Sequence, residues 1–337
     1  MNELLSFLPV PHRLACGYYS ATFLSKEGRP FAYRDDGQIY TWGLDGSMVV
    51  SKPDVKPYPI RVLSVASSGE RSTFLTADGK VYEWMWKGYI PTTPTLINLP
   101  FTVISVSFGY ESYCLVTVDG HVYDWRFVSG DKDDPIDLPA PCHQLQTSSY
   151  SDSYYALTTD GSVYTWGMNK WGQLGQGTVK LSLDPMRVMM AERVVSIASG
   201  DIHLLMLTST GEVYGCGSNY YGQLGHVGTH KSCPVLFTLP STCKMIACGC
   251  DTSFVILDTG EVYGCGDDAN GELGIGRLTI GDRPTLLKFE SSVGTSVEVI
   301  DGGKIHTNIL TVKGELYQAG GVGQRQSMSF KKVDFNV

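Results

Sequence analysis

The sequence predicts an all-β protein that folds as a seven-bladed β-propeller of four-stranded antiparallel blades. Three observations lead to this prediction. A hairpin motif with a central glycine recurs seven times in the 337 residues. A short run of small residues, called the small-residue marker below, precedes most copies of this motif. No segment shows the hydrophobic periodicity of an α-helix. Because the copies are spread along the chain, we expect residues 1–337 to form one propeller domain.

The hairpin motif combines a turn and a strand, as in "TDGSVYTWG". Asp-Gly supplies the positive φ angles of a tight two-residue hairpin turn, and Val-Tyr then places one side chain on each face of a strand. Successive turn glycines lie between 41 and 54 residues apart. They are Gly37, Gly79, Gly120, Gly161, Gly211, Gly260 and Gly314.

The small-residue marker has the forms "VASSG", "IASG" and "IACG" and lies ten to twelve residues before most turns. It leads into apolar segments that we expect to be strands, such as residues 203–209 and 253–259. Small side chains at the marker would let strands converge tightly near the axis of a radial array. Each unit is then a small sheet that buries both of its faces only by packing against its neighbours.

The two ends of the chain suggest how the ring closes. The segment "LACGYYSATFLS" begins with a marker and strand that lack an upstream partner, and "SMSFKKVDF" is a strand that lacks a downstream partner. We therefore expect the N- and C-terminal strands to pair within one blade and close the ring.

With these residues identified, the chain resembles the regulator of chromosome condensation repeat family. Residues 197–225, "IASGDIHLLMLTSTGEVYGCGSNYYGQLG", follow the pattern of that family almost throughout. The family's loop appears as "GMNKWGQLG" and "GSNYYGQLG", and as the variant "GDDANGELG". The other four units keep the turn and strand but have a shortened or altered loop. The basic N-terminal tail that the founding member uses on chromatin has no equivalent here.

The best-known activity in this family is nucleotide exchange on the GTPase Ran, so the resemblance implies binding, and activation, of a small Ras-superfamily GTPase. Asp201 in "SGDIH" and Asp251 in "GCDT" match the acidic positions of the family's marker loops, and His203 and His306 occupy its recurrent histidine position. An exchange factor must bind the nucleotide-free GTPase more tightly than the loaded form. Carboxylates can compete for the cations and the lysine that hold the phosphates.

Each of these residues also has a structural interpretation, in which Asp and His bond to backbone amides at strand ends. The structural interpretation is favoured for His203 and His306, and both interpretations stay open for Asp201 and Asp251. A second hypothesis for the whole protein is a non-catalytic scaffold that recruits a protein partner through one propeller face. Aromatic residues expected in the loops after the turn strands would anchor that partner or pack between blades: Trp86, Tyr89, Trp171, Tyr220 and Tyr221.

Composition and motifs argue against other classes of function. A net charge of −8 with a pI near 5.4 disfavours direct nucleic-acid binding. We expect no membrane span, because no apolar run approaches the ~20 residues required. No covalent catalysis, cofactor or metal site is expected, and the spacing of Cys243, Cys248 and Cys250 is not that of a structural zinc site. Nine cysteines, mostly within strand patterns, indicate an intracellular protein, cytoplasmic rather than nuclear, that we expect to be a monomer.

Overall fold

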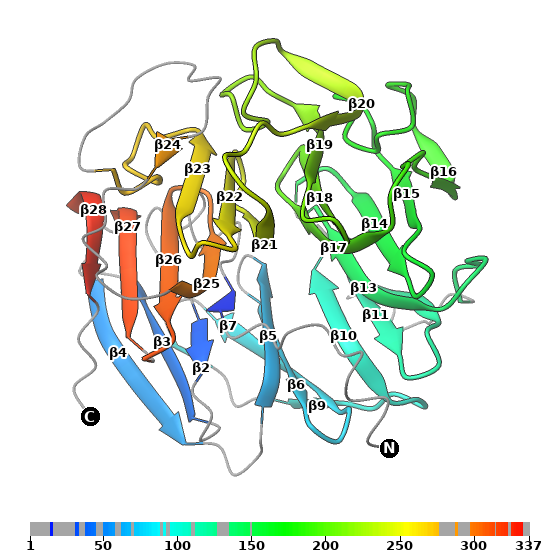
Figure 1. The fold of residues 1–337 in the computed structure, drawn as a ribbon. Coiled ribbons are helices and arrows are strands. Elements are labelled where there is room, and N and C mark those ends of the chain that lie inside the picture. The colour runs from blue at the N-terminus through cyan, green and yellow to red at the C-terminus, as the bar shows by residue number, and fades with distance from the viewer. Residues whose placement is uncertain are drawn as a thin grey trace.

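The computed structural model contains seven antiparallel sheets arranged around a common centre (Figure 1). The first strand of each sheet lies toward this centre and the last strand toward the outside. The predicted seven-bladed all-β architecture is thus confirmed. The structure describes residues 14–15, 31–33, 38–44, 50–57, 62–68, 71–87, 90–91, 95–108, 112–126, 135–148, 150–275, 287–288, 297–313, 315–322 and 325–332.

The first three sheets are formed by consecutive strands. The first sheet contains β1 (Leu14–Ala15), β2 (Phe31–Tyr33), β3 (Gln38–Leu44) and β4 (Val50–Pro57). The second contains β5 (Val62–Ser68), β6 (Arg71–Thr76), β7 (Val81–Lys87), β8 (Ile90–Pro91) and β9 (Thr95–Ile97). The third contains β10 (Val103–Phe108), β11 (Ser112–Thr117) and β12 (Val122–Arg126).

The remaining four sheets have four strands each. The fourth contains β13 (Cys142–Thr147), β14 (Ser153–Thr158), β15 (Val163–Gly167) and β16 (Ser182–Arg187). The fifth contains β17 (Val194–Ser199), β18 (His203–Thr208), β19 (Val213–Ser218) and β20 (His230–Leu236). The sixth contains β21 (Cys243–Cys248), β22 (Thr252–Leu257), β23 (Val262–Gly266) and β24 (Leu287–Lys288). The seventh contains β25 (Val297–Gly302), β26 (His306–Thr311), β27 (Leu316–Val322) and β28 (Arg325–Lys332).

Two sheets depart from the predicted four strands. In the second sheet the third strand, β7, pairs with β9 near its start and with β8 near its end. In the third sheet the described strands number three, and Ile136 forms a single bridge to Val122 beside the outer strand. Both units are among the four whose loops lack the Gly-Gln-Leu-Gly motif, whereas the first and seventh units lack it and still form four-stranded sheets.

The predicted pairing of the N- and C-terminal strands is not found among the described strands. β1 pairs with β2, and β28 pairs with β27 as the outer strand of the seventh sheet. Each of these two sheets is therefore built from consecutive strands. The inner strand β1 lies next to β25 of the seventh sheet and β5 of the second.

The hydrophobic core is divided among the spaces between neighbouring sheets. One cluster joins Leu205 and Leu207 of the fifth sheet to Val255 and Leu257 of the sixth. Comparable clusters join the second sheet to the third, the third to the fourth, the fourth to the fifth and the sixth to the seventh. The second strands β18, β22 and β26 are buried along their whole length, and β18 and β22 each lie between two such clusters. This is the burial pattern of radially packed sheets.

The small residues of the marker allow the close approach that was predicted. A Cβ atom on Gly249 would lie 2.8 Å from the carbonyl oxygen of Gly303, and one on Gly302 would lie 2.5 Å from the Cα atom of Gly249. Backbone of the sixth sheet thus touches backbone of the seventh at this point. Only residues without a side chain fit there.

The repeated turn is a three-residue loop and not the two-residue turn that was predicted. Gly79 N–H donates to Thr76 O, Thr76 N–H donates to Lys80 O, and Gly79 has φ +76°. Asp78 has no positive φ angle. This is a turn followed by one residue in the left-handed region, and only that residue must be glycine.

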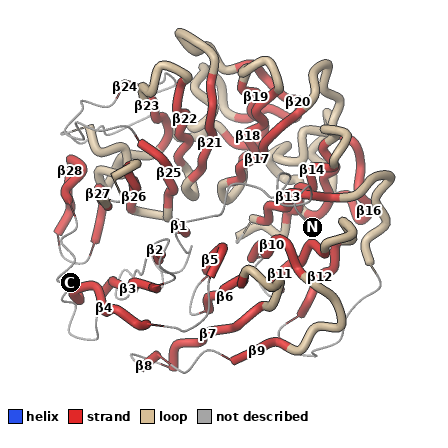
Figure 2. Tube along the Cα trace, turned by 60° about the horizontal axis from the view of Figure 1, so that its bottom comes forward, coloured by secondary structure: helices blue, strands red, loops and turns tan. Residues whose placement is uncertain are grey.

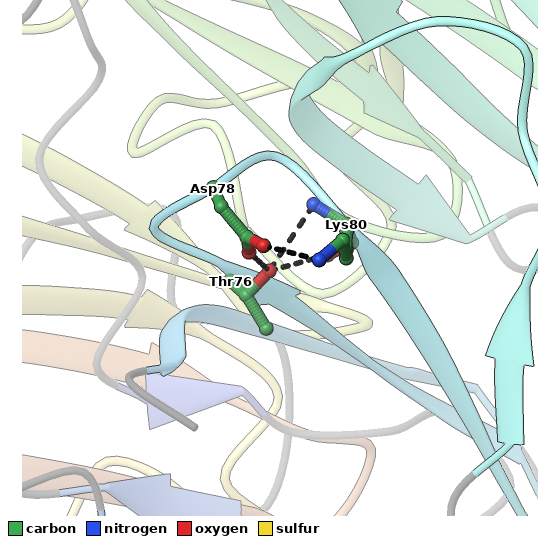
Figure 3. A network of polar contacts seen from close by, with 3 residues as sticks. All are labelled: Thr76, Asp78 and Lys80. Atoms are coloured by element: carbon green, nitrogen blue, oxygen red, sulfur yellow. Dashed lines mark hydrogen bonds and ion pairs between the residues drawn. The ribbon is translucent and has the colours of Figure 1, made fainter.

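Side chains of the same turn stabilise it (Figure 3). The Thr76 hydroxyl donates to the Asp78 carboxylate and accepts a bond from Lys80 N–H at 3.1 Å. Lys80 Nζ also lies 2.6 Å from Asp78 Oδ2. The third and fourth sheets repeat the Thr–Asp pair with Thr117 and Thr158. The motif Thr-x-Asp-Gly therefore forms what we call a self-bonded turn, which is stabilised by hydrogen bonds among its own residues. The threonine and aspartate side chains bond to each other, and the glycine adopts the positive φ angle.

Figure 2 shows strands and connecting loops, with no helix in the described part of the chain. Accordingly, no described helix could serve as a membrane-crossing segment.

Candidate functional site

Two sets of loops lie together on one face of the ring. The marker loops connect the first and second strands of a sheet, and the third-strand loops follow the third strand. In four sheets a backbone N–H at the end of the third strand, or just after it, donates to a marker-loop carbonyl oxygen. The pairs are Met168 to Asp152, Ser218 to Ile202, Asp267 to Asp251 and Gly321 to Ile305. The self-bonded turns, which connect second and third strands, lie at the opposite ends of the strands.

The marker loops of neighbouring sheets are hydrogen-bonded to one another. Asp201 N–H donates to Cys250 O at 2.9 Å, and Cys250 N–H donates to Gly303 O at 3.1 Å. On the other side, the hydroxyls of Ser148 and Ser151 donate to Asp201 O at 2.6 and 2.8 Å. The loops of the fourth to seventh sheets thus form a continuous bonded rim, which holds their side chains in fixed relative positions.

Asp201 and Asp251 lie in adjacent marker loops of this rim, on the fifth and sixth sheets. The Asp201 side chain is buried, with 7% of the residue exposed. Burial, and then the charge of Asp251, raise the pKa of Asp201 well above its usual value. The environment therefore favours the protonated form of Asp201.

Asp251 is half-buried, so part of this residue is exposed at the protein surface, whereas Asp201 is buried. Burial, followed by the charge of Asp267, raises the pKa of Asp251 to about 6, while Lys304 acts in the opposite direction. Asp251 is thus mainly ionised at neutral pH, next to a second carboxylate and one ammonium group.

Gln223 holds Asp251 from the neighbouring sheet. Its side-chain Nε2 donates to Asp251 Oδ1 at 3.2 Å, and its Oε1 accepts a hydrogen bond from Tyr221 N–H at 3.0 Å. Gln223 itself is fully buried. The side chain of the Gly-Gln-Leu-Gly motif thus connects a third-strand loop of the fifth sheet to the acidic marker loop of the sixth.

Gln173 and Glu272 occupy the position of Gln223 in the other two copies of the motif, and they have different hydrogen-bond partners. Gln173 accepts from Trp171 N–H but donates to the Ser153 hydroxyl within its own sheet. Glu272, which stands where the motif has Gln, accepts from Asn270 N–H and Asn270 Nδ2. Burial raises the pKa of Glu272 to about 7. Among these three positions, only Gln223 joins a carboxylate of the next sheet.

His203 and His306 lie inside the molecule. Both rings are buried, and burial lowers the pKa of each to about 4. His203 Nε2 lies 3.0 Å from the Ser253 hydroxyl of the neighbouring sheet. A Cβ atom on Gly200 would lie 2.2 Å from the His203 ring, so the marker glycine makes space for the histidine. The structure thus places both histidines inside the ring, away from its surface.

Three of the five aromatic candidates lie on the same face as the acidic loops. Trp171, Tyr220 and Tyr221 are exposed in third-strand loops, and the two tyrosine rings meet edge to face with their centroids 5.0 Å apart. Trp86 lies in strand β7 and not in a loop, and its backbone pairs with Pro91. Tyr89 is outside the described residues.

Sequence reasoning missed several residues of this face. Gln223, Asp267 and Lys304 lie next to Asp251, and Glu272 lies near Asp267. Tyr150 is a further exposed aromatic residue, in the marker loop that is hydrogen-bonded to Asp201. The signal for Gln223 was the repeated Gly-Gln-Leu-Gly motif, in which glutamine is the one polar side chain. Its partner in the next sheet cannot be identified from that motif.

The thiols near this rim are buried. Cys216 and Cys265 are fully buried, at the strand position that Trp166 occupies in β15. Burial raises the pKa values of Cys248 and Cys250 well above the usual thiol value. Within the described part of the chain, no cluster of three or more His, Cys, Asp or Glu residues could hold a metal ion.

Comparisons with known proteins agree with this architecture. A model of the regulator of chromosome condensation (RCC1) repeat matches residues 160–207 and 210–256, and a second model of that repeat matches residues 194–223. No curated protein sequence matches the chain.

Several solved structures share the fold. Prp20p from Saccharomyces cerevisiae, whose structure was described with its binding properties to Gsp1p and histones, has a TM-score of 0.74 at 18% identity, covering 95% of this chain and 85% of Prp20p. Human WBSCR16 has a TM-score of 0.75 at 19% identity, covering 89% of this chain and 95% of WBSCR16. The ectodomain of the Arabidopsis thaliana receptor kinase ACR4 has a TM-score of 0.62 at 12% identity, covering 94% of this chain and 98% of the ectodomain.

Proposed function

Since this chain carries repeats of the regulator of chromosome condensation family, we propose that it binds a small Ras-superfamily GTPase through the face formed by the marker loops and accelerates release of the bound nucleotide. The observation that carries the proposal is the acidic pair on that face. Asp251 is the member that reaches the partner, and Asp201 lies beneath it. The related fold of Prp20p, described as binding Gsp1p, supports the same class of partner.

The chemistry of exchange suits this arrangement. An exchange factor stabilises the nucleotide-free state of its partner, and this coupling weakens nucleotide binding by the same factor. In the loaded GTPase, the phosphates are held by a Mg²⁺ ion and a lysine. A carboxylate that is already poorly hydrated loses little solvation when it meets such a cation. Asp251 is of this kind, because burial and Asp267 both disfavour its charge in the absence of a partner.

The test is a nucleotide-release assay. A panel of purified Ras-superfamily GTPases, loaded with fluorescent GDP, is mixed with excess GTP and the full chain. We expect faster release from at least one GTPase, and about tenfold less acceleration with Asp251→Asn. Asp184→Asn is the matched control, since Asp184 is an exposed carboxylate on the outer strand β16. Unchanged release across the whole panel contradicts the proposal.

A scaffold without exchange activity is the second candidate function. The observation that favours it is the set of exposed aromatic side chains, Trp171, Tyr220 and Tyr221, on the same face. Such residues anchor many protein interfaces without any effect on chemistry. A partner that stays bound to the Asp201→Ala and Asp251→Ala variants, with no change in nucleotide release, supports the scaffold over the exchange factor.

A further inference from the structure

The loops of the fourth and fifth sheets expose apolar side chains on the face that carries the marker loops. Tyr150 lies in a marker loop with 59% of its surface exposed, and Tyr220 lies in a third-strand loop with 63% exposed. Met168, Trp171 and Tyr221 are also exposed in these third-strand loops. The fourth and fifth sheets are neighbours, with β13 and β14 in contact with β17. The five side chains therefore lie on one face of two adjacent sheets.

A pair of carboxylates adjoins these loops on the sixth sheet. Asp251 and Asp267 are both half-buried, and Asp267 N–H donates to Asp251 O at 3.0 Å. Their like charges oppose each other, and Lys304 offsets them in part. An additional cation from a partner would relieve this repulsion. The chain as a whole carries a net charge of −8, which also attracts a basic segment.

Gln223 joins the aromatic loop to the carboxylate pair. Its buried side-chain amide accepts a hydrogen bond from Tyr221 N–H and donates one to Asp251 Oδ1. The backbone beside Tyr220 and the carboxylate of Asp251 are therefore held in a fixed relation by one side chain. Preorganised groups of this kind bind without the entropic cost of ordering loops.

We propose that these loops form one docking surface for an extended protein segment, in which a Lys or Arg side chain enters between Asp251 and Asp267 and adjacent apolar side chains cover Tyr220 and Tyr221. The inference rests on the proposed function in that both place recognition on this face, and it specifies the chemistry of the partner. Aromatic side chains provide the apolar contact area, while the carboxylates select the charge and fix the register.

The test uses short fluorescent peptides and the full-length chain. One peptide set carries a single Lys or Arg flanked by Leu and Phe. One matched set replaces the basic residue with Glu, and another replaces the apolar residues with Ser. Fluorescence anisotropy gives the dissociation constants. We expect the basic apolar peptides to bind at least about tenfold more tightly than either matched set.

Variants locate the binding site. Tyr220→Ala and Asp251→Asn should each weaken binding of the basic apolar peptides by about tenfold. Asp184→Asn and Leu183→Ala change an exposed carboxylate and an exposed apolar side chain on β16, so they should leave binding unchanged. Equal binding to wild type, Tyr220→Ala and Asp251→Asn overturns the proposal, as does a lack of binding at peptide concentrations up to about 1 mM.

This outcome is separate from that of the nucleotide-release assay, because the peptides require no GTPase. Peptide binding at the proposed surface without accelerated nucleotide release would retain the docking surface and reject the exchange function. Accelerated release that depends on Asp251, without any preference for basic apolar peptides, would retain the exchange function and reject the docking surface.

Discussion

Gln223 of the fifth sheet donates a hydrogen bond to Asp251 of the sixth, with Nε2 3.2 Å from Oδ1. The donor is fully buried and the acceptor reaches the surface. A residue of the repeated structural motif therefore orients a residue of the candidate site. Stability and recognition are coupled at this contact, and substitutions here should change both.

Gln223→Glu should destabilise the fold most at alkaline pH. The substitution replaces the amide donor with a carboxylate beside Asp251, so two negative charges repel each other in a buried environment. We expect the free energy of unfolding to fall by roughly 1–3 kcal/mol at pH 8. The loss should shrink as the pH is lowered, because protonation of either carboxyl restores a donor. Urea denaturation at several pH values measures this.

Gln173→Glu is the matched control for that substitution. The Gln173 amide bonds to the Ser153 hydroxyl, so Gln173→Glu places the new carboxylate beside a neutral group and not beside a second carboxylate. Its destabilisation should be smaller and less dependent on pH. Equal losses and equal pH profiles for the two variants would show that the Asp251 contact has no special electrostatic role.

Glu272→Gln should stabilise the protein above neutral pH. Burial raises the pKa of Glu272 to about 7 from a usual value of 4.5, so the folded state binds more protons than the unfolded state between these values. Stability contributed by this group is complete below about pH 4.5 and is lost as the pH rises to about 7. The variant should thus exceed wild type by roughly 1–3 kcal/mol at pH 8 and match it near pH 4. A pH-independent difference in urea denaturation would refute this assignment.

Two turn glycines with the same backbone conformation should differ in their tolerance of alanine. Gly120 has φ +84° and Gly260 has φ +85°. A Cβ atom on Gly120 would lie 2.4 Å from Cβ of Pro141, whereas one on Gly260 would meet nothing within 4 Å. Gly260→Ala should cost about 1–2 kcal/mol from its φ angle alone. Gly120→Ala should cost about 1–3 kcal/mol more. Thermal and urea denaturation of both variants compare them, and equal losses would contradict the packing around Gly120.

Ser253→Ala should destabilise the contact between the fifth and sixth sheets. It removes the hydroxyl 3.0 Å from His203 Nε2 and leaves a buried ring nitrogen without that partner. We expect a loss of about 1–3 kcal/mol in the free energy of unfolding. Ser241→Ala, at an exposed hydroxyl, is the control and should have little effect. A Ser253→Ala variant as stable as wild type would mean that the histidine needs no partner there.

The sequence was sufficient to predict the repeat architecture, because each unit carries its own local signals. Thr-x-Asp-Gly, as at residues 76–79, determines a turn from contacts within a few residues, and the marker glycines report close packing near the axis. The turn length was wrong, because Asp-Gly is compatible with both two-residue and three-residue loops. The contact of the threonine hydroxyl with the aspartate distinguishes them only once the coordinates are known.

Contacts between sheets could not be predicted in the same way. The expected pairing of terminal strands relied on incomplete sequence units at the two ends, whereas β28 completes the seventh sheet. The burial of Asp201 depends on how Ser148 and Cys250 of neighbouring sheets close over its loop. The bond from Gln223 to Asp251 likewise depends on the relative placement of two sheets, which no single repeat encodes.

The most direct test of the proposed exchange function is the affinity of the full chain for one GTPase in two states. The dissociation constant is measured for the nucleotide-free and the GDP-loaded forms of whichever GTPase responds in the release assay. We predict that the nucleotide-free form binds at least about tenfold more tightly, and that Asp251→Asn reduces this ratio. Equal affinities for the two forms, or a ratio that Asp251→Asn leaves unchanged, would contradict the role assigned to the acidic marker loops.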